Sequence, residues 1–285
     1  DPYLESLLAI SATASREYAL QVRVDTMMKE WSEVKLVIDA STASNRSISN
    51  FDDLLARIDE SVIDLQQMRK SRHSLPSLDK IVGWEEQLGT LSDVLDDWMV
   101  AQKQYLRLSP ILSPESMKYR LPEQHRRFRD VDRRFTEIMD IATKTPRILV
   151  VTAVPKLREV LVESIRILDE ILLSLNAYLD EVKNGYGRLY FLSTDSLLEL
   201  VSLSATTFED PSAMGHVSLL IAPIFAGVQK MLGVEVKDPK LGIGAVGAVE
   251  ASDGAVLDIV PVSLNHDILQ WLPELEEKMQ TSVKM

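Results

Sequence analysis

The sequence contains no cysteine, and this absence excludes several kinds of chemistry at once. Without thiols the chain forms no disulfide, performs no thiolate catalysis and binds no zinc ion or iron–sulfur cluster through cysteine. Long hydrophobic runs are also missing, because purely apolar stretches such as residues 148–151 are far too short to span a bilayer. We therefore expect no membrane-spanning segment.

Positive charge is scarce relative to negative charge. The chain has 31 Lys and Arg residues against 43 Asp and Glu residues, a formal net charge of −12. A chain with this excess of carboxylates is a poor general binder of phosphate backbones and anionic lipids. We therefore expect neither nucleic acid nor membrane among its partners.

The motifs of common enzyme sites are missing. The sequence has no G-x-x-x-x-G-K-[ST], no H-E-x-x-H and no G-x-S-x-G. The adjacent Asp96 and Asp97 diverge by about 100° on a helix, so they cannot form a facing acid–base pair. The histidines lack metal-ligand spacing; they are His73, His125, His216 and His266. We therefore predict no catalytic residue, no cofactor site and no metal site.

One glycine-rich motif needs separate treatment. Residues 242–247 read Gly-Ile-Gly-Ala-Val-Gly and fit G-x-G-x-x-G. A dinucleotide site also needs a preceding strand and a following helix, whereas Asp253-Gly254 breaks any helix here. We interpret the run as a glycine turn in a β element. A nucleotide-dependent oxidoreductase stays open as an alternative that a ligand-induced thermal shift would reveal.

The dominant positive signal is helical periodicity. One heptad seam over residues 81–105 steps by three and four, over roughly 37 Å. Its members are Ile81, Trp84, Leu88, Leu91, Leu95, Trp98, Gln102 and Tyr105. A second long rod is predicted over residues 155–183, at roughly 43 Å. Its stripe consists of Leu157, Leu161, Ile165, Leu168, Leu172, Leu175 and Leu179. Such long seams are typical of coiled coils and helical bundles.

Prolines and capping residues predict where the other elements begin and end. Ser109-Pro110 and Ser113-Pro114 are expected to end the first rod, and Pro122 suits the first turn of the next helix. Asp195 or Ser196 is expected to cap a later helix, with Glu199 at capping-box spacing from Ser196. A further helix is expected over residues 215–232, kinked at Pro223.

A change of period marks the C-terminal part. Residues 233–263 are rich in Gly and Val, and Asp253-Gly254 is a good hairpin turn. We therefore predict a mainly α fold, an elongated stack of long helices and helical bundles with a small β-hairpin element near residues 233–263. The expected subdivisions are an N-terminal bundle over 1–110, a central bundle over 111–232, and the β element with a closing helix over 233–285.

A local basic cluster has two interpretations. Its members are Arg126, Arg127, Arg129, Arg133 and Arg134, interleaved with Asp130 and Asp132. An exposed helix face with ion pairs three and four residues apart explains it. A patch that docks onto an acidic protein surface explains it as well, and both readings stay open.

Several motifs stand in a fixed order along the chain. Residues 84–102 contain Trp84-Glu85-Glu86-Gln87-Leu88 and then Trp98 and Gln102, and residues 188–199 begin with Arg188-Leu189-Tyr190-Phe191-Leu192-Ser193. They resemble W-E-x-x-L with W-x-x-x-Q and R-F-Y-F-L-S-N-D-E-L-L-E, which are motifs of one family, the linker region of dynein heavy chains. The family-motif residues are Trp84, Trp98, Asp132, Tyr178, Arg188, Tyr190, Phe191, Asp195, Glu199 and Trp271. The chain also departs from the pattern: the family's F-P-R is here Tyr186-Gly187-Arg188.

The resemblance implies a function that composition alone does not. A dynein linker is a helical lever across a ring of AAA+ modules, and its swing drives movement towards the microtubule minus end. The resemblance implies a non-enzymatic piece of a much larger chain, with ATP and Mg in the parent motor. Implied partners are the AAA+ ring of the same heavy chain, other dynein subunits and, indirectly, microtubules. Residues 14–20 look axonemal, which implies the cytoskeleton of a cilium or flagellum. A static helical scaffold is the alternative.

Overall fold

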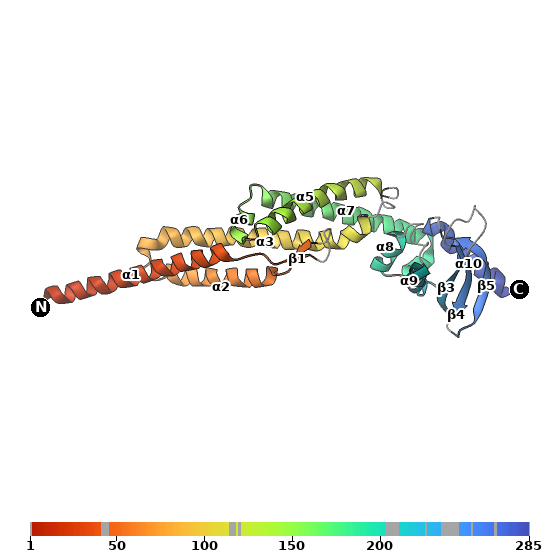
Figure 1. The fold of residues 1–285 in the computed structure, drawn as a ribbon, viewed down its shortest axis with the longest axis horizontal. Helices are drawn as coiled ribbons and strands as arrows, with labels where there is room; N and C mark the ends of the chain where they lie inside the picture. Colours follow the sequence, from red (N-terminus) through yellow and green to blue (C-terminus); the bar gives the residue numbers. More distant parts are fainter. Residues whose placement is uncertain are drawn as a thin grey trace. The chain divides into compact units, whose positions relative to one another are not determined.

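The computed structural model describes residues 2–40, 46–113, 118, 121–202, 211–225, 227–234, 245–251, 253–264 and 267–284 (Figure 1). It divides into two compact units. Unit 1 comprises Asp1–Arg107 with Arg129–Leu168, and unit 2 comprises Leu108–Phe128 with Asp169–Met285. Most described residues are helical, so the mainly α class is confirmed. The subdivision at 110 and 232 stays a prediction.

Unit 1 is built from long helices and one short hairpin. Its elements begin with α1 (Pro2–Glu33), β1 (Ile38–Ala40), β2 (Arg46–Ile48), α2 (Phe51–Arg69) and the short η1 (Leu75–Ser77). They continue with α3 (Leu78–Leu112), α5 (Pro122–Lys144), α6 (Ile148–Thr152) and α7 (Leu157–Gly185). The unit boundary falls inside α3, α5 and α7, so each of these helices contributes residues to both units.

The predicted seam of α3 is confirmed, and the helix is longer than expected. All eight seam residues from Ile81 to Tyr105 are buried. The expectation that Pro110 ends the helix is wrong, because α3 runs through it to Leu112. A proline near a helix C-terminus removes a single N–H bond, and Ser113 N still donates to Ser109 O at 3.0 Å. Pro114 lies outside the described residues.

The hairpin of β1 and β2 lies outside the predicted β region. The two strands pair antiparallel, with Ile38 opposite Ile48 and Ala40 opposite Arg46. The sequence pattern predicted a β element near residues 233–263 and gave no sign of this additional hairpin. Three-residue strands are too short to show the alternation of apolar and polar residues that identifies a strand. The hairpin is held instead by side chains of α3 and α5, as described below.

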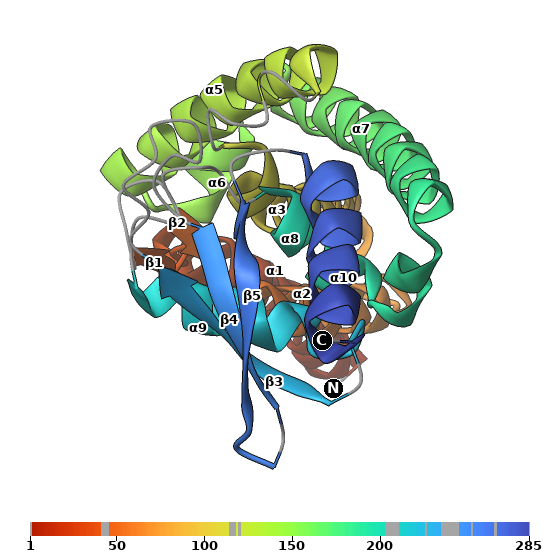
Figure 2. The same cartoon turned by 90° about the vertical axis from the view of Figure 1, so that its right-hand side faces the viewer.

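Unit 2 joins the C-terminal part of α7 to a small sheet. Its further elements begin with η2 (Gly187–Phe191), α8 (Thr194–Ser202), α9 (Pro211–Ile221) and β3 (Val228–Val234). They end with β4 (Ala245–Ala251), β5 (Val256–Ser263) and α10 (Ile268–Lys284). The antiparallel sheet has the order β3-β4-β5, with α9 and α10 beside it (Figure 2). The predicted turn is confirmed: Gly254 has φ 82°, and Val249 pairs with Leu257.

Two element ends in unit 2 correct the sequence-based expectations. The helix expected over residues 215–232 is wrong, because α9 ends at Ile221 and β3 begins at Val228. Pro223 cannot donate a helical hydrogen bond, and it disfavours helical geometry in the residue before it. The cap of α8 comes from Ser193, whose hydroxyl accepts from Ser196 N at 3.1 Å, and not from Asp195 or Ser196.

Candidate functional site

The two tryptophans of the α3 motif are core residues. Trp84 and Trp98 are 4% and 0% exposed, and the Phe51 ring meets Trp98 edge-on at 6.5 Å between centroids. Neither indole N–H has an acceptor among the described residues. Both rings therefore act as apolar packing groups that fix α3 within unit 1.

The motif glutamine Gln102 joins α3 to the hairpin. Its Oε1 accepts from the main-chain N–H of Ile48 at 2.8 Å, and its Nε2 donates to the Ile48 carbonyl at 2.9 Å. Gln102 and Ile48 are both buried. From α5, Asp140 forms an ion pair with Arg46 of β2 at 2.6 Å. Side chains of two helices therefore hold strand β2 in place.

The motif carboxylate Asp132 links α5 to α3. The Tyr105 hydroxyl of α3 donates to Asp132 Oδ1 at 2.7 Å. The Tyr105 ring stacks on Phe135, one turn further along α5, with 4.3 Å between centroids. A polar and an aromatic contact from one tyrosine thus fix how the two helices lie against each other.

Arg158 ties the first turns of α7 to α3. Its Nη1 lies 2.9 Å from Asp93 Oδ2, and its Nε donates to Asp97 Oδ2 at 3.0 Å. The hydrogen bond to Asp97 is the main cause that raises the pKa of Arg158, and the charge of Asp93 adds to it. Asp97 therefore takes part in an inter-helix ion pair, whereas its neighbour Asp96 is exposed.

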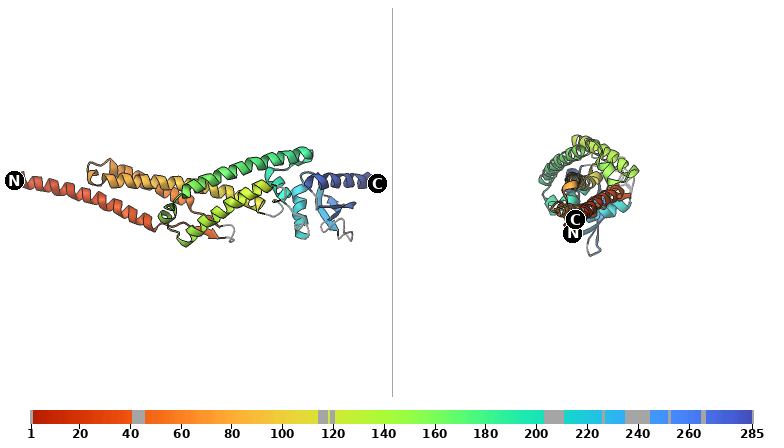
Figure 3. Two further views of the ribbon diagram at one scale, coloured as in Figure 1. Left: turned by 90° about the horizontal axis from the view of Figure 1, so that it is seen from above. Right: turned by 90° about the vertical axis from the view of Figure 1, so that its left-hand side faces the viewer.

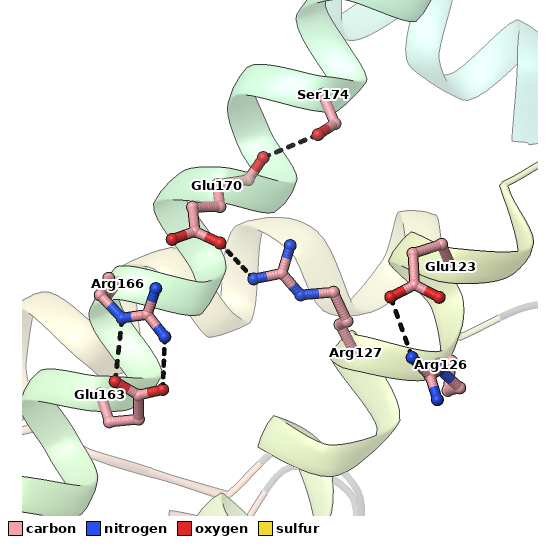
Figure 4. Close-up of polar contacts among 7 residues, drawn as sticks. All are labelled: Glu123, Arg126, Arg127, Glu163, Arg166, Glu170 and Ser174. Carbon is pink, nitrogen blue, oxygen red and sulfur yellow. Dashed lines mark hydrogen bonds and ion pairs between the residues drawn. The ribbon is translucent and has the colours of Figure 1, made fainter.

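The basic cluster on α5 is largely paired with carboxylates. Within the helix, Arg126 pairs with Glu123 at 3.0 Å, Arg129 with Asp132 at 3.5 Å and Arg133 with Asp130 at 3.8 Å. Arg127 instead reaches Glu170 of α7 (Figure 4). Arg134 lines a cavity of about 480 Å³ with residues of α7. These contacts match the reading of an exposed helix face with ion pairs, and the docking patch stays a prediction.

Carboxylates of α7 take part in further local contacts that Figure 4 displays. Glu163 accepts two hydrogen bonds from Arg166, at 2.9 and 2.6 Å, and the Ser174 hydroxyl donates to the Glu170 carbonyl at 3.0 Å. The first pair spans one helical turn, which is the spacing that supports a helix along its own surface. The Glu163–Arg166 pair therefore supports α7 along its own surface.

Arg188 is the centre of a polar cluster in unit 2. Its Nη2 lies 2.7 Å from Glu276 Oε1 of α10, and its Nη1 donates to the Ile224 carbonyl at 3.2 Å. The guanidinium also lies 5.5 Å from the centre of the Phe225 ring, a cation–π distance. This single side chain connects η2, the turn after α9 and the closing helix.

Tyr186 completes this cluster from the other side of Glu276. Its hydroxyl donates to Glu276 Oε2 at 2.5 Å, and burial, followed by this bond, raises the pKa of Tyr186 above its ordinary value. We call Tyr186, Arg188 and Glu276 the Glu276 clamp. The family pattern has Phe where this chain has Tyr186, so this departure from the pattern supplies a hydrogen bond that Phe cannot make.

The end of α7 lies close to α10 at the clamp. A Cβ atom at Gly185 would come within 2.9 Å of the Leu269 side chain. A Cβ atom at position 185 would therefore require the Leu269 side chain to move. The close approach and the clamp together fix the end of the rod to the closing helix.

The remaining motif residues are spread through unit 2. Trp271 is buried, Tyr178 is half-buried, and Asp195 lies exposed in the first turn of α8. The Tyr190 hydroxyl donates to Asn184 at 2.7 Å, whereas Phe191 is 71% exposed. Glu199 accepts from His216 Nε2 at 2.7 Å. The motif residues therefore form structural contacts at several places and do not converge on one pocket.

Sequence reasoning missed two members of the clamp. Tyr186 appeared only as a departure from the family pattern, and Glu276 was not among the predicted site residues. Eighty-eight positions separate Arg188 from Glu276, so no local spacing rule could pair them. No local sequence pattern therefore marked Glu276 as the partner of Arg188.

The described residues contain no group of three or more His, Asp and Glu side chains placed to hold a metal ion. His125 donates through Nδ1 to the Leu112 carbonyl at 2.8 Å, while His266 lies outside the described residues. Residues 242–244 of the glycine-rich run also lie outside them, and residues 245–247 belong to β4. In the part of the chain that is described, no helix has the length and apolar character needed to cross a membrane.

Comparison with known proteins places these motifs in a family. The family described as "Dynein heavy chain, N-terminal region 2" matches residues 1–285. Human dynein axonemal heavy chain 12 is 31% identical over 284 residues, which cover 99% of this chain and 9% of that protein. Human dynein axonemal heavy chain 3 is 30% identical, with 99% and 7% covered. Human dynein axonemal heavy chain 1 is 28% identical, with 99% and 6% covered.

The chain therefore spans less than a tenth of the length of these relatives. The match nevertheless extends over all 285 residues and includes the motif residues of α3, η2 and α10. The chain belongs to the dynein heavy chain family, as its N-terminal region 2.

Proposed function

We propose that this segment is the mechanical linker of a dynein motor, the lever that couples ATP hydrolysis in an adjoining AAA+ ring to the power stroke. The stroke moves the motor towards the microtubule minus end. The AAA+ ring of the same heavy chain is its direct partner, and ATP and Mg act in that ring. The segment itself carries out no catalysis.

The observation that carries this proposal is the way long helices are fixed to one another. A lever must transmit force without bending along its length. α3 has 35 residues and α7 has 29, or roughly 52 and 43 Å. Tyr105–Asp132 and Arg158–Asp97 fix α3 to α5 and α7, and the Glu276 clamp fixes the end of α7 to α10. Close-packed helices of this kind switch between discrete arrangements and do not deform continuously.

The named relatives support a setting for the motor. The three relatives above are axonemal heavy chains. We propose that the parent chain of this segment works in the axoneme of a cilium or flagellum. It acts there on microtubules together with other dynein subunits, and cytosolic transport is the less favoured setting.

The test makes α7 more flexible and leaves its buried residues unchanged. Leu173 and Asn176 lie on the exposed side of α7, so the double change Leu173→Gly with Asn176→Gly leaves the buried face intact. Each Gly weakens a helix by about 1 kcal/mol relative to Ala. In a full heavy chain, the Gly pair should slow microtubule gliding while ATP turnover continues.

The matched control is the Ala pair at the same two positions, which removes the same side chains and keeps the helix stiff. Gliding with the Ala pair should match that of the unmodified motor. Equal gliding speeds for the Gly and Ala pairs would favour the alternative function, a static scaffold that docks partners without carrying force.

A further inference from the structure

The chain between α1 and α2 is longer than a turn between these helices requires. The helices run antiparallel, because Arg23 of α1 pairs with Asp64 at 2.7 Å. Further along α1, Glu30 lies 3.9 Å from Arg57, which is nearer the start of α2. Two antiparallel helices can be joined by about 2–5 residues, whereas residues 34–50 join these two. The additional residues therefore serve contacts other than the turn itself.

The first part of this segment pairs with the turn between α5 and α6. Lys35 lies opposite Arg147 in an antiparallel bridge, and the main-chain N–H groups of Leu36 and Ile148 donate the flanking hydrogen bonds, at 2.8 and 3.0 Å. Leu36 and Ile148 are buried, so water cannot replace these bonds. Arg147 also pairs with Glu33, the last residue of α1, at 3.3 Å. The end of α1 is thus bonded to a turn 114 positions further along the chain.

Asn50 holds the same stretch from the other side. Its Oδ1 accepts from Val37 N at 2.9 Å, and its Nδ2 donates to the Lys35 carbonyl at 3.2 Å. Asn50 occupies the N-cap position of α2, where an asparagine side chain ordinarily accepts from the first helical N–H groups. Its side chain makes no such bond here. Asn50 therefore fixes the segment and leaves α2 without a side-chain cap.

These contacts and the two described above for the hairpin form one group, which we call the α1 joint. Its members are the bridge of Lys35 with Arg147, the side chain of Asn50, the pairing of Gln102 with Ile48, and the ion pair of Arg46 with Asp140. All of them belong to unit 1. The segment after α1 is thereby bonded to α3, to α5 and to the turn that follows α5. A segment attached at three places cannot rotate about any one of them.

The α1 joint lies in line with α1. In two side views the chain leaves α1 and continues in the same direction into β1 (Figure 1 and Figure 3). Hydrogen bonds between antiparallel strands are perpendicular to the strands. A pull along α1 therefore acts on these bonds together and does not open them one after another. Residues 3–16 of α1 are all exposed, so force applied there reaches the rest of unit 1 through the second half of α1 and the joint.

We infer that the α1 joint is a fixed joint, which stays closed during the ATP cycle and carries force from α1 into α3 and α5. The inference rests on the proposed lever function, because a moving lever places a load on this point. A joint that opened under load would absorb the stroke. Residues 34–50 are therefore not the place where the lever bends.

The first test locks the α1 joint. Lys35 and Arg147 form a non-hydrogen-bonded pair, whose Cα atoms lie about 4.5 Å apart, within the range of a disulfide. Both side chains are exposed, and the segment has no cysteine. The double variant Lys35→Cys with Arg147→Cys is made in the full heavy chain and oxidised with glutathione disulfide. Each single variant under the same oxidant is the control.

The locked motor should glide at the same speed as its reduced form. Slower gliding after oxidation of the double variant alone would mean that the joint opens during the stroke, which overturns the inference. Failure of the two cysteines to join would contradict the pairing on which the inference depends.

The second test weakens the α1 joint. Asn50→Ala removes two of its hydrogen bonds without removing a cap from α2. Arg23→Ala is the matched control, because it removes a contact between α1 and α2 that lies outside the joint. In the full heavy chain, Asn50→Ala should keep the unloaded gliding speed and lose stall force in an optical trap. Arg23→Ala should keep both.

An unchanged stall force for Asn50→Ala overturns the inference, and so does an equal loss for Arg23→Ala. A loss of unloaded speed with Asn50→Ala indicates a general structural defect and overturns it as well. Asn50→Asp keeps the acceptor for Val37 N and loses the donor, so it takes the place of an Asn50→Ala variant that does not fold.

The Gly pair in α7 separates this inference from the proposed function. If the Gly pair slows gliding while Asn50→Ala leaves the stall force unchanged, the inference about the α1 joint fails alone. If neither change affects motility, the lever function fails with it.

Discussion

The side-chain amide of Gln102 pairs with the main chain of Ile48 as a neighbouring strand would. It accepts from Ile48 N–H at 2.8 Å and donates to the Ile48 carbonyl at 2.9 Å. Both residues are buried, so water cannot replace these bonds. One glutamine on a long helix thereby supplies hydrogen-bond partners for the N–H and C=O groups on the outer edge of a three-residue strand.

Replacing Gln102 by leucine should therefore be costly. The change keeps an apolar body in the core but leaves the N–H and C=O groups of Ile48 without partners. Each unsatisfied buried group costs about 1–3 kcal/mol, so we expect the free energy of unfolding to fall by about 2–5 kcal/mol. Urea denaturation of the chain measures this loss.

A second glutamine provides the control for this measurement. Gln66 on α2 is exposed and donates to Glu85 at 3.2 Å. Gln66→Ala should change the free energy of unfolding by less than about 0.5 kcal/mol. If Gln102→Leu is no more harmful than Gln66→Ala, the strand-like pairing does not stabilise the fold.

Three consecutive residues of α7 test the packing of the rod. Ile171 is 0% exposed, Leu172 is half-buried and Leu173 is 70% exposed. The predicted stripe included Leu172, but the fully buried position is Ile171. Ile171→Ala should lower the free energy of unfolding by about 2–5 kcal/mol, and Leu172→Ala should lower it clearly less. Leu173→Ala should lower it by under about 0.5 kcal/mol. Thermal or urea unfolding of the three variants should give this order, and any other order would mean that α7 is rotated.

This comparison also shows what the sequence could predict. The seam of α3 was predictable because polar, charged or glycine residues occupy most of the positions between its members. In α7, Ile171, Leu172 and Leu173 are all apolar, so periodicity alone could not choose between them. Contacts between distant segments, such as Gln102 with Ile48 or Arg188 with Glu276, depend on tertiary packing that local patterns do not encode.

The Glu276 clamp has a defined pH dependence. Tyr186→Phe removes the hydroxyl that donates to Glu276, and we expect a loss of about 1–2 kcal/mol at neutral pH because the cluster is only partly buried. The pKa of Tyr186 is raised in the folded chain. The Tyr186 hydroxyl therefore makes its full contribution to the free energy of unfolding at pH values below the ordinary tyrosine pKa of about 10. The contribution is then lost as the pH rises further. The stability gap between the original chain and Tyr186→Phe should therefore be constant below about pH 9.5 and narrow above pH 10.

Tyr190→Phe is the matched control, because the Tyr190 hydroxyl donates to the nearby Asn184 on an exposed surface. This variant should lose less than about 0.5 kcal/mol at neutral pH. Unfolding curves recorded from pH 7 to 11 provide the comparison. A gap for Tyr186→Phe that widens with alkaline pH would contradict the assignment of the hydroxyl as the donor to a carboxylate.

The proposed lever role requires this segment to swing during ATP turnover, and detecting that swing is the most direct test of the account. Lys103 is exposed on α3, so Lys103→Cys offers a labelling site in a segment without other cysteines, and a second dye is placed on the AAA+ ring of the full heavy chain. Single-molecule energy transfer should alternate between two discrete values at the rate of ATP turnover. A single constant value, while ATP turnover and microtubule gliding continue, would contradict the account.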